Sequence, residues 1–483
     1  FFTHTPATPT LRSLVGSEMC IRDRNNTMKS DRKLVAHLMR RAGFGATPQE
    51  LDHLTSTKSY EEIVEDLTNP EKFDPIDMSY VERYYTGEPV AVHVGKWLYR
   101  MANTKRPLEE KMSLFLHHIF PVAWGKSEHG PSLYREIEMF RNTGLTNFKN
   151  ILLNLSKDPA MLFWLDNNEN HKDEINENYG RELLELFSMG VGNYTENDIK
   201  NASRAFTGWT FRQPLSLYPY GHHHADFEFI SHDHDYDEKE FLGQVGNFDG
   251  EDIIDIIVKE EAAANFLSRH LYNFFVEDEP QVPAWSVVPP NNPGAVDFLA
   301  KELMDSNYHM ETVLRKLFNS DFFKEAQFSR VKNPTEVVVS TLRLVGDSGL
   351  PGPDILDWTG QIVYMGQDLL NPPSVEGWHS GIEWINSGTL MKRTNFMSEM
   401  ISDYSRPGVK SIIDQVSRSA SKPEEVVTAC LDIMGPLEIA EKTRSELLEH
   451  VSSQGDFDWD SDGVTRTLEL LQLVVATREY QFA

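Results

Sequence analysis

Helix start signals recur along this chain, each in front of apolar residues that repeat with helical spacing. The first apolar stripe consists of Leu34, Val35, Leu38 and Met39. Residues 47–50 (Thr-Pro-Gln-Glu) then supply an N-cap threonine, a proline at the first helical position and a glutamate at the third. Alternation typical of a strand is scarce and is clearest at residues 226–230. The pattern predicts a mostly α, multi-helix globular fold with long ordered loops and little β structure.

The same signals place further helices along the chain. We expect them at residues 108–120, 145–155, 178–189, 195–206, 251–258, 261–275, 294–306, 310–319, 334–345, 354–365, 423–434, 440–452 and 462–477. Two long stretches interrupt this series: residues 207–250, rich in aromatic residues, His, Gly and Asp, and residues 366–396, rich in Pro, Gly and Trp. Loops of this length are usually functional or disordered, and their aromatic content favours order.

Composition excludes several classes of protein. The 483 residues carry a formal net charge of −28, which disfavours nucleic acid and anionic lipid as partners. No stretch approaches the ~20 apolar residues of a membrane span. Two cysteines are too few for a disulfide framework or a cysteine-based zinc cluster. Phosphate-binding glycine loops, the GxSxG elbow and the HExxH motif are also absent from the sequence.

The first 27 residues differ from the rest. They have neither a helical nor an alternating period, and LRSLVGSEMCIRDR at residues 11–24 resembles a translated sequencing adapter. We expect residues 1–27 to be a non-native or disordered tail, with the natural chain starting near Met28. Residues 28–350 should form a helical core with 207–250 as a loop insertion, and residues 351–483 a C-terminal helical part, carrying the 366–396 loop, that packs on the core. No signal peptide is visible, so the compartment stays open, and export is compatible with a missing native N-terminus.

Two adjacent histidines end the helix expected at 108–120. Neighbouring helical residues point about 100° apart, so His117 and His118 cannot face the same site equally. One of them could enter a site while the other caps the helix or meets solvent. The alternative is a plain helix-terminal pair favoured by the helix dipole.

The helix expected at 178–189 has one polar face. It is formed by Asn178, Arg181, Glu182 and Glu185. Carboxylates three residues apart on one face are how helical bundles present ligands to metal ions. An ordinary amphipathic surface helix would show the same pattern.

A histidine-rich segment follows, with His222, His223 and His224 and then His232-Asp233-His234-Asp235. Histidine together with aspartate suits zinc, iron or manganese. Exposed histidine runs also bind metal adventitiously, so the 232–235 group is the stronger candidate. The loop at 371–378 (NPPSVEGW) is interpreted as a rigid brace for a neighbouring site.

These pieces in this order resemble the bacterial family known as domain of unknown function 1800. The matching segments are 38–45, 110–115 with His118 and Phe120, 176–178 with 181–183, 190–195, 204–209, 241–243 and 371–378. The resemblance implies no established reaction. It does imply an export signal in many members and a partner related to sulfatase-like proteins, which is often encoded beside them. This chain departs from the pattern by its missing signal and by its adjacent His117 and His118.

Two hypotheses follow. The first is an enzyme with a metal-dependent or carboxylate/histidine acid–base site, a hydrolase first and an oxidoreductase second, acting on a polar or anionic substrate. In it His118, Glu182 and Glu185 act as ligands or acid–base groups, and Arg181 holds an anionic substrate group or orients Glu185. A divalent transition metal would be bound by His118, His232, His234 and Asp235, and would make hydroxide available near neutral pH.

The second hypothesis is a non-catalytic binding or scaffold protein that recognises glycan or a protein partner. Here the polar clusters are buried hydrogen-bond networks that fix helix packing. Convergence of His118, Glu182 and His234 on one solvent-reachable cavity would favour the enzyme.

Overall fold

The computed structural model describes residues 30–483 except 88, 213–224, 281–284, 347–348, 350–353, 454 and 456. In this part of the chain it contains 24 α-helices and two small two-stranded sheets, which confirms the mostly α prediction. None of the described helices is both long and apolar enough to cross a membrane. The predicted tail and His222, His223 and His224 lie outside the described residues.

The helices and strands have the following bounds. The first part holds α2 (Arg32–Arg41), α3 (Pro48–Thr57), α4 (Tyr60–Thr68), α5 (Ser79–Tyr84), α6 (Val90–Asn103), α7 (Pro107–Ile119), α8 (Trp124–Ser127) and α9 (Gly130–Thr143). The middle holds α10 (Phe148–Ser156), α11 (Pro159–Trp164), α12 (Asn178–Glu185), α13 (Glu196–Ala205), β1 (Trp209–Arg212), β2 (Asp226–Phe229), β3 (Lys239–Phe241), β4 (Gln244–Gly246) and α14 (Gly250–Ile257). The remainder holds α15 (Glu261–Phe275), α16 (Pro293–Asp305), α17 (Met310–Asn319), α18 (Asp321–Glu325), α19 (Pro334–Val345), α20 (Asp354–Tyr364), α21 (Ser387–Ser402), α22 (Pro407–Ser419), α23 (Pro423–Ile433), α24 (Glu441–Ser452) and α25 (Gly463–Ala476).

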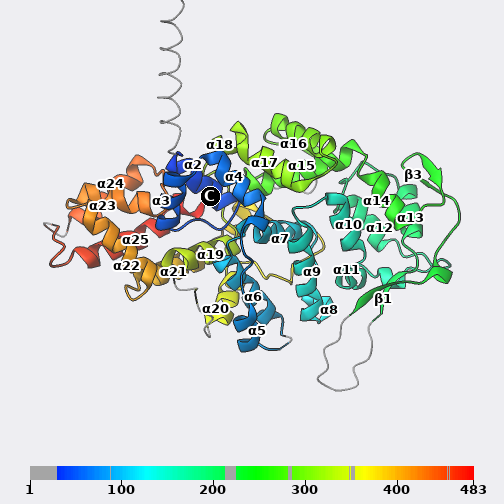
Figure 1. The fold of residues 1–483 in the computed structure, drawn as a ribbon, viewed down its shortest axis with the longest axis horizontal. Helices are drawn as coiled ribbons and strands as arrows, with labels where there is room; N and C mark the ends of the chain where they lie inside the picture. Colours follow the sequence, from blue (N-terminus) through cyan, green and yellow to red (C-terminus); the bar gives the residue numbers. More distant parts are fainter. Residues whose placement is uncertain are drawn as a thin grey trace, which may run out of the picture.

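The molecule is elongated, and distant parts of the sequence lie side by side near its middle. Figure 1 shows α22–α25 at one end of the long axis and α10–α14 with the short strands at the other. Between them α7 packs on α9, α20 packs on α6, and α21 packs on both α19 and α25. The helices after residue 351 therefore contact the first helices of the chain directly.

Local sequence signals explain where several helices begin. Thr47 and Thr195 both form capping boxes, accepting the N–H of the third helical residue while that residue's carboxylate accepts the cap N–H. The strand expected at 226–230 is β2, which pairs antiparallel with β1. The described parts of 207–250 contain both sheets. The loop expected at 366–396 is shorter than predicted, because Asn386 caps α21 and a helix begins at Ser387.

Candidate active site

A cavity of about 490 Å³ lies where the end of α7, the end of α12, the first turns of α15 and the 371–378 loop meet. Its polar lining includes His118, Glu185, Asn265, His270, Asp297 and Glu376. A second cavity of about 140 Å³ adjoins it and shares His118, His270, Trp285 and Glu376. The shared residues make the two cavities one polar site with two lobes.

The two adjacent histidines at the end of α7 have different roles. His117 is fully buried, and its Nε2 accepts the N–H of Leu370 at 3.0 Å, so it anchors the segment that leads into the 371–378 loop. His118 turns to the cavity, where its ring stacks on that of Trp378 with a centroid separation of 6.3 Å. Burial, together with the charges of Arg330 and His379, lowers the pKa of His118 to about 4. His118 is therefore a neutral imidazole at neutral pH.

Gly377 allows the loop to approach α7 closely. It has a positive φ of 79°, and a Cβ at this position would lie 2.5 Å from the carbonyl oxygen of His118. A residue with a side chain would be strained by this φ and would clash with that oxygen, so the position requires glycine. The contact places Glu376 beside His118 in the wall of the cavity.

His270 is a second imidazole in the cavity, and the sequence did not reveal it. Its ring on α15 lies between Phe266 and Trp285, with centroid separations of 4.4 and 4.7 Å. Burial and the nearby charges of His118 and Arg269 lower the pKa of His270 to about 3. Within the described part of the chain, no hydrogen bond is recorded for the ring of either His118 or His270. Both rings are thus available to a ligand.

Glu185 and Glu376 line the cavity, and a third glutamate, Glu182, lies near both of them without lining it. Glu182 and Glu185 lie one turn apart on α12, and Glu185 accepts a hydrogen bond from the Tyr194 hydroxyl at 3.1 Å. Burial, then the charges of Glu185 and Glu376, raise the pKa of Glu182 to about 7. At neutral pH a large fraction of Glu182 is consequently protonated, as a general acid requires.

Close packing of α12 on α13 holds this carboxylate group in position. A Cβ at Gly180 would lie 2.1 Å from the Ser203 hydroxyl oxygen on α13, so the two helices meet where α12 has no side chain. Leu183 and Leu184 are fully buried on the inner face of α12. The polar face predicted from the sequence therefore points away from the core, and Glu185 points to the cavity.

Arg181 has partners outside the cavity. Its guanidinium donates two hydrogen bonds to Glu196, at 3.1 and 2.8 Å, and lies 3.5 Å from Glu177. It contributes nothing to the described cavity lining. The roles predicted for Arg181, in holding an anionic substrate group or orienting Glu185, stay predictions.

The 232–235 segment is tied to neighbouring helices and loops rather than to the cavity. His234 is buried and its Nδ1–H donates to the carbonyl of Thr207 at 2.8 Å, while Asp235 accepts from Arg204 at 2.6 Å. His232 is exposed. None of the three appears in the described cavity lining beside His118. Across the described residues, no three His, Cys, Asp or Glu side chains are grouped so that they could hold a metal ion.

The cavity has a negative electrostatic character. Glu185, Asp297 and Glu376 line it, and Glu182 lies next to two of them. The one cationic side chain in the described lining, Arg269, is already engaged by Glu279 at 2.7 Å and by the carbonyls of Trp285 and Val288. This arrangement disfavours an anionic ligand and suits a cationic or an uncharged polar one.

A family model matches most of the chain. The family described as "Protein of unknown function (DUF1800)" matches residues 37–482, and the chain belongs to that family. The match includes every residue of the cavity described above. No curated protein and no solved structure matches the chain.

Proposed function

We propose that the protein is a hydrolase with a carboxylate/histidine acid–base site that acts on an uncharged polar substrate. The observation that carries this proposal is the convergence of Glu185, Glu376, His118 and His270 on one cavity, with Glu182 beside them. These groups come from four separate segments of the chain. Their meeting in a hollow of this size is typical of an active site.

The environments of these groups suggest a division of roles. Glu182 is the general acid, because burial and its carboxylate neighbours keep a proton on it near neutral pH. Glu376 is the base that activates a water molecule for attack. His118 and His270 are neutral, and their free ring nitrogens orient the substrate by hydrogen bonds.

Carbohydrate is the substrate class that this lining fits best. Trp285 and Phe266 supply aromatic surface to the wall that can contact the apolar side of a sugar ring, and the amides of Asn193 and Asn265 can hydrogen-bond to hydroxyls. A protonated and an ionised carboxyl group are also the pair that glycosidic bond cleavage needs. The free carboxylates would repel a phosphate or sulfate ester.

The test is turnover of a panel of uncharged oligosaccharides and aryl glycosides by the purified protein. Glu182→Gln is expected to reduce kcat at least about 100-fold, since a general acid contributes at least that factor. Glu71→Gln, at an exposed surface position, is the matched control and should leave kcat unchanged. Full turnover by the Glu182→Gln variant would refute the assignment.

The same panel tests the non-catalytic alternative. The aromatic lining, and above all Trp285 and Phe266, would also serve a glycan-binding protein. In that case the wild-type protein binds a member of the panel without converting it, and Glu182→Gln leaves the Kd within a few-fold of wild type. Calorimetric titration beside the turnover assay separates the two functions.

A further inference from the structure

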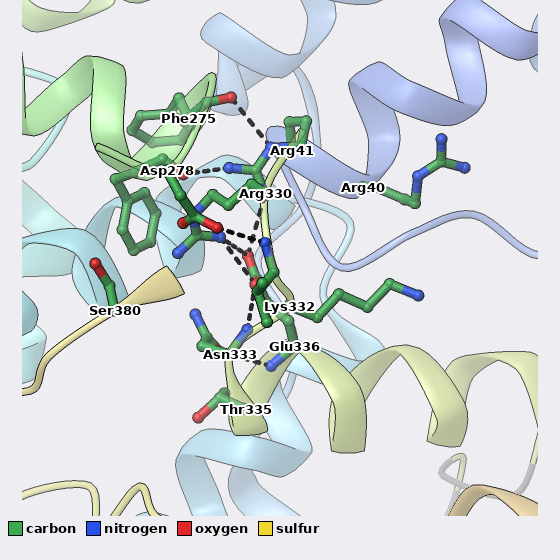
Figure 2. A network of polar contacts seen from close by, with 12 residues as sticks. Arg40, Arg41, Phe275, Asp278, Arg330, Lys332, Asn333, Thr335, Glu336 and Ser380 are labelled. Atoms are coloured by element: carbon green, nitrogen blue, oxygen red, sulfur yellow. Dashed lines mark hydrogen bonds and ion pairs between the residues drawn. The ribbon is translucent and has the colours of Figure 1, made fainter. Parts of the chain in front are cut away.

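A buried ion-pair network lies behind the active-site cavity and is centred on Glu336 at the start of α19. Figure 2 shows its members converging from α2, from the segment after α15 and from residues 330–336. Arg330 donates from Nη1 to both carboxylate oxygens of Glu336 at 3.0 Å, Lys111 forms a further ion pair with it, and Arg41 lies 3.5 Å away. Asp278 lies 3.8 Å from Arg330. In this inner group three cations face two carboxylates.

Three more cations surround this group and have only uncharged recorded partners. Arg40 donates to the carbonyl of Gly435 at 2.9 Å, and Lys332 donates to that of Tyr480 at 2.7 Å. Arg393, fully buried, donates to the carbonyl of Lys332 at 2.8 Å. The buried Nε atoms of Arg40 and Arg393 have no hydrogen-bond partner among the described residues.

The positive charge of this region is therefore in excess. Six cationic side chains, those of Arg40, Arg41, Lys111, Arg330, Lys332 and Arg393, stand beside two carboxylate side chains, those of Glu336 and Asp278. Burial lowers the pKa of Lys332 to about 7, with the charges of Arg40 and Arg393 adding to the effect. An uncompensated buried charge costs several kcal/mol, so a counter-ion that reached the site would be bound favourably.

A small cavity opens at the place where the excess charge lies. It has a volume of about 60 Å³ and is lined by Arg40, Lys332, Arg343, Glu336 and Tyr480 among others. One water molecule needs only about 10–15 Å³ by this kind of measure, so the cavity has room for a small ion. The carboxylate of Glu336 is paired with Arg330, and the guanidinium of Arg343 is paired with Glu50. Arg40 and Lys332 are therefore the cationic side chains in the wall that have only carbonyl groups as recorded hydrogen-bond partners, and Ala483 also lines the cavity.

We propose that this cavity, between α2 and the segment 332–336, binds a small inorganic anion held by Arg40 and Lys332. A halide and a tetrahedral oxyanion share the required chemistry, which is one negative charge able to accept hydrogen bonds from a guanidinium and an ammonium group. The site is separate from the acid–base cavity and independent of the proposed hydrolase function. Its anion joins α2 to the segment 332–336 and so stabilises the folded protein.

The experiment is thermal unfolding of the full chain at constant ionic strength, with sodium gluconate replaced stepwise by chloride, bromide or phosphate. The wild-type Tm is expected to rise with the logarithm of the anion concentration, because the anion binds only the folded state. Lys332→Met should lose this rise, and Lys301→Met, at an exposed position on α16, should retain it. A larger rise in Tm with chloride identifies the bound anion as a halide, and a larger rise with phosphate identifies it as a tetrahedral oxyanion.

Two results would overturn the proposal. The first is a wild-type Tm that rises with the concentration of each anion no more steeply than the Tm of the Lys332→Met variant does. The second is the absence of both a bromide anomalous peak and phosphate density next to Arg40 and Lys332, in crystals grown in bromide and in phosphate respectively. If Lys332→Met fails to fold, Arg40→Gln replaces it in the unfolding series, and the bromide and phosphate crystals of the wild-type protein still decide the position.

Discussion

Replacing Glu182 with glutamine is expected to stabilise the protein at pH 8 while it removes the proposed activity. The folded-state pKa of Glu182 is about 7, above its ordinary value of 4.5. Between pH 4.5 and pH 7 the folded protein therefore keeps a proton on Glu182 that the unfolded chain has already lost. Stability consequently falls as pH rises from 4.5 through 7, and the full penalty is present above pH 7. Glutamine keeps the shape of the protonated acid and carries no such penalty.

The size of the effect follows from the same values. The difference between about 7 and 4.5 corresponds to about 3 kcal/mol at about 1.4 kcal/mol for each pH unit. Because Glu182 is partly exposed, solvent screening reduces this to about 1–2 kcal/mol. In a chain of this length that is a rise of about 1–4 °C in Tm.

Differential scanning calorimetry of the wild-type protein, Glu182→Gln and the Glu71→Gln control at pH 5 and pH 8 measures this effect. The Tm of Glu182→Gln should exceed that of the wild type at pH 8 and nearly equal it at pH 5, and the control should match the wild type at both. A Tm that is lower than wild type at both pH values would refute the reasoning, because it would mean that the carboxylate stabilises the fold.

Three further predictions concern stability. Gly180→Ala should cost about 1–3 kcal/mol in urea unfolding, since its Cβ would overlap Ser203, whereas Gly360→Ala, with its nearest neighbour at 3.7 Å, should be neutral or slightly stabilising. Glu336→Gln should cost about 3–5 kcal/mol, because it leaves the buried Arg330, Lys111 and Arg41 without their shared counter-charge; a wild-type urea midpoint would contradict this. Three buried histidines, His37, His117 and His270, have folded-state pKa values of about 3, below the ordinary 6.5. Their contribution to the free energy of unfolding is therefore complete above pH 6.5 and is lost as pH falls toward 3. Urea midpoints that stay unchanged from pH 7 to pH 5 would disprove this prediction.

Helices whose ends carry local signals were predictable from the sequence. The helices at 261–275, 310–319 and 334–345 have the expected bounds, and α19 begins with an asparagine capping box followed by proline. Some of the helices that were missed do carry such signals, since α4 and α21 begin with capping boxes at Ser59 and Asn386 and α11 begins with Asp158 followed by proline. Others lack these signals or use unusual ones. α6 begins after Pro89 with no side-chain cap, and α9 is capped by a histidine ring. Sequence patterns report local chemistry, and these starts are fixed largely by packing.

The candidate site was predictable only in part, for the same reason. His118 and Glu185 share the cavity and Glu182 adjoins it, and all three stand in recognisable helical patterns. His270 has no such pattern, because no acidic residue or second histidine lies within two turns of it on α15, and its role depends on Trp285 and His118 from other segments. Conversely, His234 and Asp235 form a conspicuous cluster whose partners, Thr207 and Arg204, only the tertiary structure reveals.

The close contact between Gly377 and His118 has a consequence for the order in which the site can form during synthesis. One wall of the cavity is made by residues near 118, 185 and 270, and the wall that closes it arrives only with Glu376 and Gly377. A nascent chain that has emerged to residue 350 can fold many helices, but it has no closed pocket. The pairing spans more than 250 residues, so it forms late and slowly compared with the local helices. The pocket is thus expected to close only after most of the polypeptide has left the ribosome, and products truncated before residue 376 are expected to lack its closing wall.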